Sequence, residues 1–156
     1  MIMIINKKMS MAQAILDNKQ LIPLLPRFKI DLGFGEKTVE AVCKMHGVNV
    51  DFFLEIVNSY VHEEYVPQND LTLFPLSTMV HYLKNTHSLY LEQELPRVEA
   101  EILELICKSD LSKDKKNLVV TFFGDYKQDF IAHIMKEEDE VLPYILELEE
   151  QYEKTA

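Results

Sequence analysis

The sequence predicts an all-α protein with a small N-terminal helical domain at 1–65, a linker at 66–76 and two long helices at 77–156. Three observations lead to this prediction. Only 4 glycines occur in 156 residues, so the chain has few sites for sharp turns. Apolar residues make up 47% of the chain, which is enough for a packed core. In the second half, apolar residues recur at steps of three and four, the period of an α-helix.

The N-terminal domain is predicted to contain short helices at 12–17, 21–28 and 38–46. A turn separates the second from the third, because Gly33 and Gly35 can both adopt positive φ angles. The third helix should end at Gly47, a residue suited to the position after a helix C-terminus. Either Asn49 or Asp51 should cap the helix that follows.

The second half is predicted to form helices at 77–108 and 117–152, joined by a polar reversal at 109–116. A connection this short makes the two helices antiparallel neighbours in a hairpin. Pro96 and Pro143 lie inside the two helical patterns, and each removes one backbone hydrogen bond. Two interpretations remain open: the prolines bend the helices around a functional centre, or they mark where each helix bends or ends.

Each long helix carries an apolar stripe that polar residues interrupt near its middle. In the first helix the only polar member is His87, among Val80, Leu83, Leu91, Leu95, Val98, Ile102 and Leu105. In the second helix the interruptions are His133 and Glu137, among Val119, Phe123, Tyr126, Phe130, Val141, Tyr144, Leu148 and Tyr152. A carboxylate on a buried stripe is costly unless it is paired, neutralised or bound to a metal.

Two chemical interpretations of these interruptions stay open. The two imidazoles and the carboxylate could be ligands of iron, manganese or zinc, which accept nitrogen and oxygen donors. Alternatively, His87 is a hydrogen-bonded core histidine, and His133 and Glu137 form a buried ion pair.

Charge and cysteine content exclude several classes of function. The net charge is −10, which disfavours binding to nucleic acids. No apolar run approaches the roughly 18 residues that a membrane span needs. Cys43 and Cys107 lie far apart, as expected for a protein of the reducing cytoplasm. No arrangement for nucleophilic catalysis or phosphate cradling is recognisable.

Two segments resemble the ligand helices of hemerythrin-like, HHE cation-binding proteins. The first runs from His87 to Leu95-Pro96, and the second contains His133, Glu137 and Leu142-Pro143. The stretch 30–43 is also similar to the N-terminal domain of di-iron proteins that repair iron–sulfur clusters. The resemblance implies half of a hemerythrin-like four-helix bundle around a non-haem di-iron centre. His87 and His133 would be terminal ligands and Glu137 a bridge, and such centres bind nitric oxide or oxygen, or donate iron to damaged clusters.

This chain departs from the family pattern in two ways. Family members carry a Cys-Cys pair in the N-terminal turn, whereas residues 32–34 contain no thiol, and Cys43 is expected in the core. Thiol chemistry by that turn is therefore not expected. In addition, only two of the four bundle helices are present, and His46, His62 and His81 are not expected to complete the ligand set.

Either a second copy of the chain or further helices of a longer chain could supply the missing ligands. We expect a homodimer formed through the two long helices. Tyr90, Glu94 and Tyr126 are candidates for hydrogen bonds to the ligands. The alternative function is a metal-free helical module for protein interaction or regulation.

Overall fold

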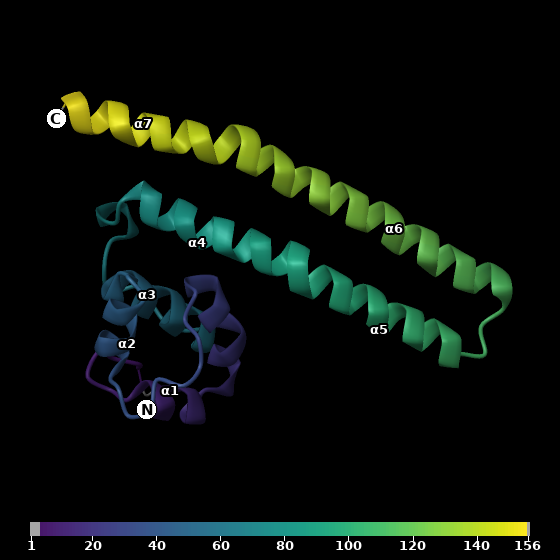
Figure 1. Ribbon diagram of the computed structural model, residues 1–156, viewed down its shortest axis with the longest axis horizontal. Helices are drawn as coiled ribbons and strands as arrows, with labels where there is room; N and C mark the ends of the chain where they lie inside the picture. The colour runs from purple at the N-terminus through teal and green to yellow at the C-terminus, as the bar shows by residue number, and fades with distance from the viewer. Residues whose placement is uncertain (1–3, 156) are drawn as a thin grey trace. The chain divides into compact units, whose positions relative to one another are not determined.

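The computed structural model describes residues 4–155, and within them the protein is all-α, without β-strands. The fold class is therefore confirmed. The chain divides into two compact units, Met1–Asn85 and Thr86–Ala156 (Figure 1). Across the described part of the chain, no helix combines the length and the apolar character needed to cross a membrane.

The first unit consists of short helices, and two of their predicted caps are present. Its elements are α1 (Met11–Asp17), the 3-10 helix η1 (Lys19–Phe28), α2 (Val39–Met45), α3 (Val50–Val61), η2 (Leu71–Leu73) and the first part of α4 (Leu76–Leu89). Gly47 follows α2 with a φ of 67°, as predicted. Of the two candidate caps for α3, Asn49 is the one used, since its side chain accepts a hydrogen bond from the amide of Phe52 at 3.0 Å.

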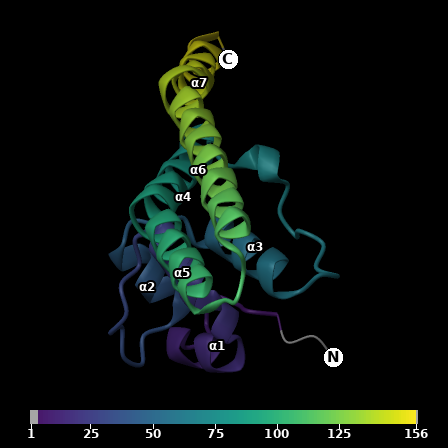
Figure 2. The same cartoon turned by 90° about the vertical axis from the view of Figure 1, so that its right-hand side faces the viewer.

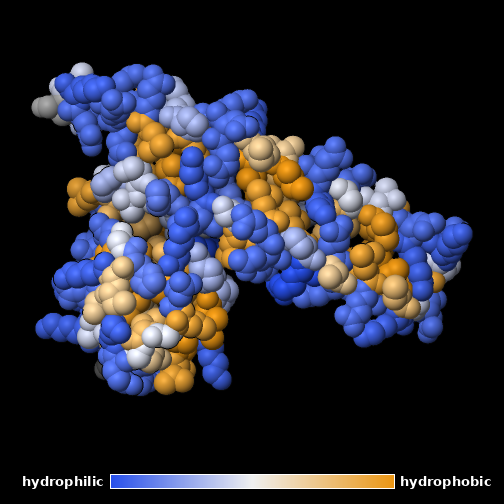
Figure 3. All heavy atoms as spheres, viewed as in Figure 1, coloured by the Kyte–Doolittle hydropathy of each residue, from blue (hydrophilic) through white to orange (hydrophobic). Residues whose placement is uncertain are grey.

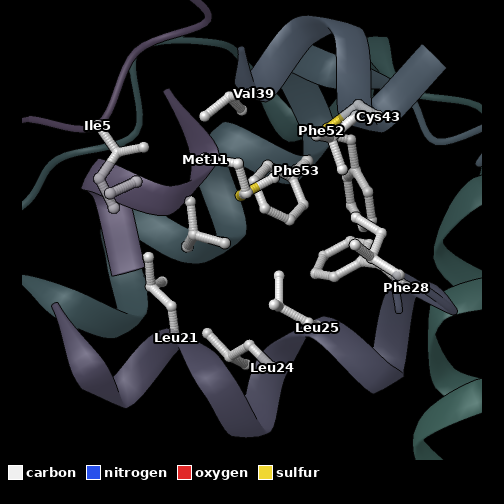
Figure 4. Packing of buried hydrophobic residues seen from close by; sticks show 14 of the residues in the cluster. Ile5, Met11, Leu21, Leu24, Leu25, Phe28, Val39, Cys43, Phe52 and Phe53 are labelled. Carbon is white, nitrogen blue, oxygen red and sulfur yellow. The ribbon is translucent and has the colours of Figure 1, made fainter. Parts of the chain in front are cut away.

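The core of the first unit is a cluster of aliphatic and aromatic side chains (Figure 4). Its fully buried members include Met11, Leu21, Leu24, Leu25, Val42, Cys43, Phe53 and Val57. Phe28 packs edge-on against Phe53, with ring centroids 4.9 Å apart. Cys43 lies in this core as predicted, and burial raises the pKa of its thiol to about 12, so it is no thiolate at neutral pH.

The boundary between the units lies inside α4 rather than in the predicted linker at 66–76. The reason is that residues on both sides of the expected boundary join the N-terminal core. Phe74 is buried there, and Met79 and Tyr82 of α4 pack against the same cluster. The first turns of the long helix therefore belong to the first unit.

Asn58 on α3 fixes the N-terminal segment to this core. Its side-chain oxygen accepts from the amide of Ile5 at 2.8 Å, and its nitrogen donates to the Ile5 carbonyl at 2.9 Å. The same nitrogen also donates to the carbonyl of Leu54 at 2.9 Å. Asn58 is 1% exposed. Its side-chain amide therefore supplies the hydrogen-bond partners that the buried backbone N–H and C=O of Ile5 need.

A second buried polar residue on α3, Glu55, holds the segment that follows the helix. Its carboxylate accepts from the amide of Asn69 at 2.8 Å and its side-chain nitrogen at 2.6 Å, from the hydroxyl of Tyr65 at 2.9 Å, and from the amide of Gln68. Burial acts to raise the pKa of this carboxyl, but the hydrogen bonds from Tyr65, Asn69 and Gln68 outweigh it, and the pKa is lowered.

We expect the first unit to lose stability in acid through Glu55. Because the pKa is lower in the folded state, the stabilisation is complete above the unfolded value of about 4.3 and disappears as the pH falls through the folded value. Glu55→Gln should therefore destabilise at pH 7, and the difference from the parent should shrink below pH 4. Amide exchange of Phe53 and Val57 measures this, with the exposed Glu64→Gln as control. An equal pH dependence of stability in the Glu55→Gln variant and the parent would contradict the assignment.

The second unit is an antiparallel pair of long helical segments (Figures 1 and 2). Its elements are the end of α4, η3 (Tyr90–Glu94), α5 (Leu95–Lys108), α6 (Lys113–Lys136), η4 (Glu137–Val141) and α7 (Leu142–Thr155). The reversal occupies 109–112, shorter than predicted, because α6 begins at Lys113. Between the helices, Lys127 pairs with Glu99 at 2.6 Å, and the rings of Tyr90 and Phe130 lie 6.1 Å apart.

Neither proline ends its helix, and each follows a π-helical segment instead. η3 and η4 are π-helices, and the residue before each proline donates its amide to a carbonyl five residues earlier: Leu95 to Tyr90 and Leu142 to Glu137. A proline ring clashes with the carbonyl four residues before it in a regular α-helix. The wider winding removes that carbonyl from its usual position, so the helix continues past Pro96 and Pro143.

The predicted apolar stripe of the second long helix does not form the buried face, and this part of the prediction is wrong. Ile134 and Leu142 are buried, whereas Tyr144 and Tyr152 of the predicted stripe are 60% and 75% exposed. In the first helix the predicted stripe members Val80, His87 and Leu95 are buried, but near its end Ile106 is buried in place of Leu105. Two helices cover only one side of each other, and the remaining apolar side chains lie at the surface, seen as orange areas between hydrophilic atoms (Figure 3).

Candidate metal centre

The three residues selected from the sequence come together in the second unit. Nε2 of His87 lies 3.3 Å from Oε2 of Glu137, and Nε2 of His133 lies 3.1 Å from Oε1 of the same carboxylate. Each oxygen of Glu137 thus faces a different imidazole. The two histidines come from different long helices, α4 and α6, so the cluster connects the antiparallel pair.

Glu138 is a fourth member that sequence reasoning missed. Its Oε1 lies 2.8 Å from Nδ1 of His87, so this ring lies between two consecutive carboxylates. In a regular α-helix the residue after Glu137 faces about 100° away from it, so the stripe pattern in the sequence did not select Glu138.

The local winding explains how consecutive residues reach one side chain. In an α-helix each residue is rotated about 100° from the one before, so neighbours usually point to different surroundings. Glu137 and Glu138 begin the π segment η4, whose wider turn spreads more residues over the face towards α4. His87 stands between them and is 7% exposed.

The burial of the cluster is graded from one helix to the other. The side chain of His87 is 9% exposed, that of Glu137 33%, and that of His133 67%. The site is therefore closed on the side of α4 and open on the side of His133. Any further ligand, from solvent or from another protein chain, would approach next to His133.

The hydrogen-bonding capacity of His87 allows two states. With Nδ1 protonated, the ring donates to Glu138, which fixes its orientation and leaves Nε2 facing Glu137. Nε2 then either carries a proton, giving an imidazolium paired with both carboxylates, or offers its lone pair to a metal. The Nδ1 contact to a carboxylate is the usual outer partner of a metal-bound histidine.

The donor types and separations suit a metal, but the number of donors is too small. Two ligand atoms about 2.1 Å from one metal and at right angles lie about 3.0 Å apart, close to the two imidazole–carboxylate separations. A metal ion between either histidine and Glu137 would thus have one nitrogen donor and one oxygen donor from this chain. Within residues 4–155, no group of three or more His, Cys, Asp or Glu side chains is arranged to hold a metal ion.

The other residues considered from the sequence lie outside this cluster. Glu94, expected near the ligands, pairs with Arg97 at 2.5 Å. Tyr90 and Tyr126 line an apolar hollow of about 350 Å³ with Phe123, Phe130, Leu95 and Val98. Tyr90 follows His87 by three residues and Phe130 precedes His133 by three, so the hollow lies one helical turn from the cluster.

Comparisons with models of protein families, with curated proteins and with solved structures find no match for this chain.

Proposed function

We propose that this chain is a hemerythrin-like, non-haem di-iron protein, in which Glu137 bridges two irons and His87 and His133 each hold one of them. The observation that carries the proposal is the placement of one oxygen of Glu137 against each imidazole. An ion pair with one histidine would use only one side of the carboxylate, whereas here each oxygen of Glu137 faces a different imidazole. The side chain of His87 is 9% exposed, and at so buried a position an uncompensated charge is costly.

The resemblance to iron–sulfur cluster repair proteins suggests the role of the proposed centre in the cell, which is the handling of nitric oxide, oxygen or iron. A centre of this kind supplies iron redox chemistry and open coordination positions, which suit nitric oxide or oxygen as ligands or the release of iron. The contribution of this chain is to hold and orient the site. Glu138 keeps the His87 ring in one orientation, and the exposed side of His133 leaves access for a small ligand or a partner.

We further propose that a second copy of the chain completes the centre. One imidazole and one carboxylate oxygen per iron leave most coordination positions of a six-coordinate metal empty. A twofold axis beside His133 would bring together four histidines and two glutamates. The same side of the hairpin carries exposed apolar residues, among them Val141, Tyr144 and Leu148, that a second hairpin could cover.

Anaerobic loading with ferrous iron tests the proposal. We expect about two irons per dimer, the content of one di-iron centre, and a charge-transfer absorption in the near ultraviolet. His133→Ala and Glu137→Gln should abolish both the iron content and the absorption. His81→Ala and Glu140→Gln are the matched controls, because each removes the same kind of side chain from an exposed position outside the cluster.

Three results would count against the proposal in different ways. Iron content that is equal in the parent and in both cluster variants would place the metal elsewhere. A full complement of iron in a monomer would exclude the second copy as the source of ligands. Protein that takes up no iron under these conditions would favour the metal-free interaction module, with the His87 ring held between Glu137 and Glu138.

A further inference from the structure

A cleft of about 380 Å³ in the first unit differs in charge from the rest of the protein. The chain contains 26 acidic residues among 156, yet none of the residues described as lining the cleft is Asp or Glu. Its lining instead includes Arg27, Lys29, His46 and His81. Arg27 and Lys29 give the hollow two positive charges in a protein of net charge −10, and the two imidazoles add nitrogen atoms that can form hydrogen bonds.

Helix ends add to this positive charge. Asn49 and Phe52, at the start of α3, and Ser77 and Thr78, in the first turn of α4, all line the cleft. The N-terminus of a helix carries a partial positive charge, which favours a nearby anion even though the amides of Phe52 and Thr78 are already paired, with the Asn49 side chain and the Pro75 carbonyl. The two helix ends therefore add to the positive potential of the cleft without offering free amide donors at Phe52 or Thr78.

One wall of the cleft is aromatic. Phe28, Phe52 and Tyr82 line it, and the rings of Phe28 and Tyr82 lie 4.9 Å apart. The guanidinium of Arg27 donates to the hydroxyl of Tyr82 at 3.4 Å, which places a charge next to this wall. Phe28 and Phe52 are only 6% and 4% exposed, so a flat apolar body would pack mainly on Tyr82 while its anionic group faces the cations.

The backbone at Lys29 determines where this side chain lies at the edge of the cleft. Lys29 is the one non-glycine residue within 4–155 with a positive φ, at 53°. It ends η1 and contributes to the lining of the cleft. The left-handed conformation is that of a helix C-cap, in which the amides of Lys29 and Ile30 donate to the carbonyls of Pro26 and Leu25, and it sets the position at which the Lys29 side chain leaves the helix.

We propose that this cleft binds a small organic phosphate with a flat apolar body. Arg27 and Lys29 hold the phosphate, the imidazoles of His46 and His81 add hydrogen bonds, and the ring of Tyr82, with Phe28 and Phe52 behind it, packs against the body. The volume is at the small end of ligand sites, so the ligand is a single ring or a mononucleotide rather than a long cofactor. The inference is independent of the metal centre, since all these residues lie within Met1–Asn85.

Binding of phenyl phosphate to the metal-free 156-residue chain tests the proposal. Inorganic phosphate and phenol serve as probes for the two halves of the ligand. We expect saturable binding of phenyl phosphate by calorimetry, with weaker binding of either half. Amide resonances of Lys29, Gly47 and Thr78 should shift with the same saturation curve.

Charge-removing variants provide the decisive comparison. Lys29→Gln and Arg27→Gln should each weaken the binding of phenyl phosphate by about tenfold or more, as expected for a lost charged hydrogen bond. Lys19→Gln is the matched control, since it removes the same charge from an exposed position of the same helix η1. Lys29 is exposed, so its replacement should leave the amide spectrum of the core unchanged even if Arg27→Gln disturbs the packing of Tyr82.

The proposal is overturned if phenyl phosphate at millimolar concentration gives no saturable binding. It is also overturned if the resonance shifts lie outside the cleft, or if Lys19→Gln weakens binding as much as Lys29→Gln. Equal affinity for inorganic phosphate and phenyl phosphate would show that the aromatic side chains contribute nothing to binding. The proposed ligand class, a phosphate with a flat apolar body, would then be wrong.

Discussion

Replacement of Asn58 by alanine is expected to lower the free energy of unfolding of the first unit by about 3 kcal/mol. The substitution removes three hydrogen bonds at once, two of them to the backbone of Ile5. The amide and carbonyl of Ile5 would then be buried without partners, and each such group costs about 1–3 kcal/mol. A cavity in place of the amide adds to the loss.

Amide hydrogen exchange is the appropriate measurement, because a chain of two units need not unfold in one step. The protection of Phe53 and Val57, both buried on the same helix, reports on the first unit alone. Ser59→Ala is the matched control, as it shortens the exposed neighbour of Asn58 and should change stability by less than about 0.5 kcal/mol. Similar losses in the two variants would mean that Asn58 does not hold the N-terminal segment in solution.

The second large effect is expected on self-association. If a second copy covers the exposed side of the hairpin, Tyr144→Glu with Leu148→Glu should raise the dissociation constant of the dimer about a hundredfold or more. These side chains are 60% and 43% exposed in the single chain, and a twofold interface would bury four new charges without partners. Iron content should fall with the dimer, because each copy alone has half of the donors.

Analytical ultracentrifugation over a range of concentrations measures this effect. Thr121→Glu with Gln128→Glu is the control, since it introduces two glutamates at exposed positions of α6 away from the apolar side. Dimers of equal strength in the two double variants would place the interface elsewhere. A parent protein that stays monomeric at every concentration would remove the second copy from the proposal altogether.

Local signals in the sequence were sufficient for most of the fold. The side-chain cap at Asn49 and the glycine after α2 are each determined by a few neighbouring residues, so the short helices could be predicted closely. The boundary at Asn85 could not, because it depends on Phe74 and Tyr82 reaching a core built from residues far away in the chain. η1 was predicted as a helix, and it forms as a 3-10 helix that contains Pro23 and Pro26.

Three of the four residues of the candidate centre could be predicted from the sequence, and the fourth could not. His87, His133 and Glu137 are polar interruptions of apolar helices, and such interruptions are visible in the sequence. The periodic pattern nevertheless selected the wrong buried face in the second helix, since Ile134 rather than His133 is covered by the neighbouring helix. A stripe identifies apolar surface that must be covered, but it does not tell which partner covers it. Glu138 was missed because regular α-helical periodicity assigns it to solvent.

The π segments place a constraint on chain length that side chains do not reveal. A π turn is an α-helix that accommodates one surplus residue, and each residue in an α-helix accounts for about 100° of rotation. Loss of one residue between Glu137 and Val141 would leave the helix content almost unchanged. It would nevertheless turn all of α7, with Tyr144 and Leu148, away from its present side relative to His133. The number of residues in this segment therefore matters more than the identity of Asp139 or Glu140, whose side chains are exposed.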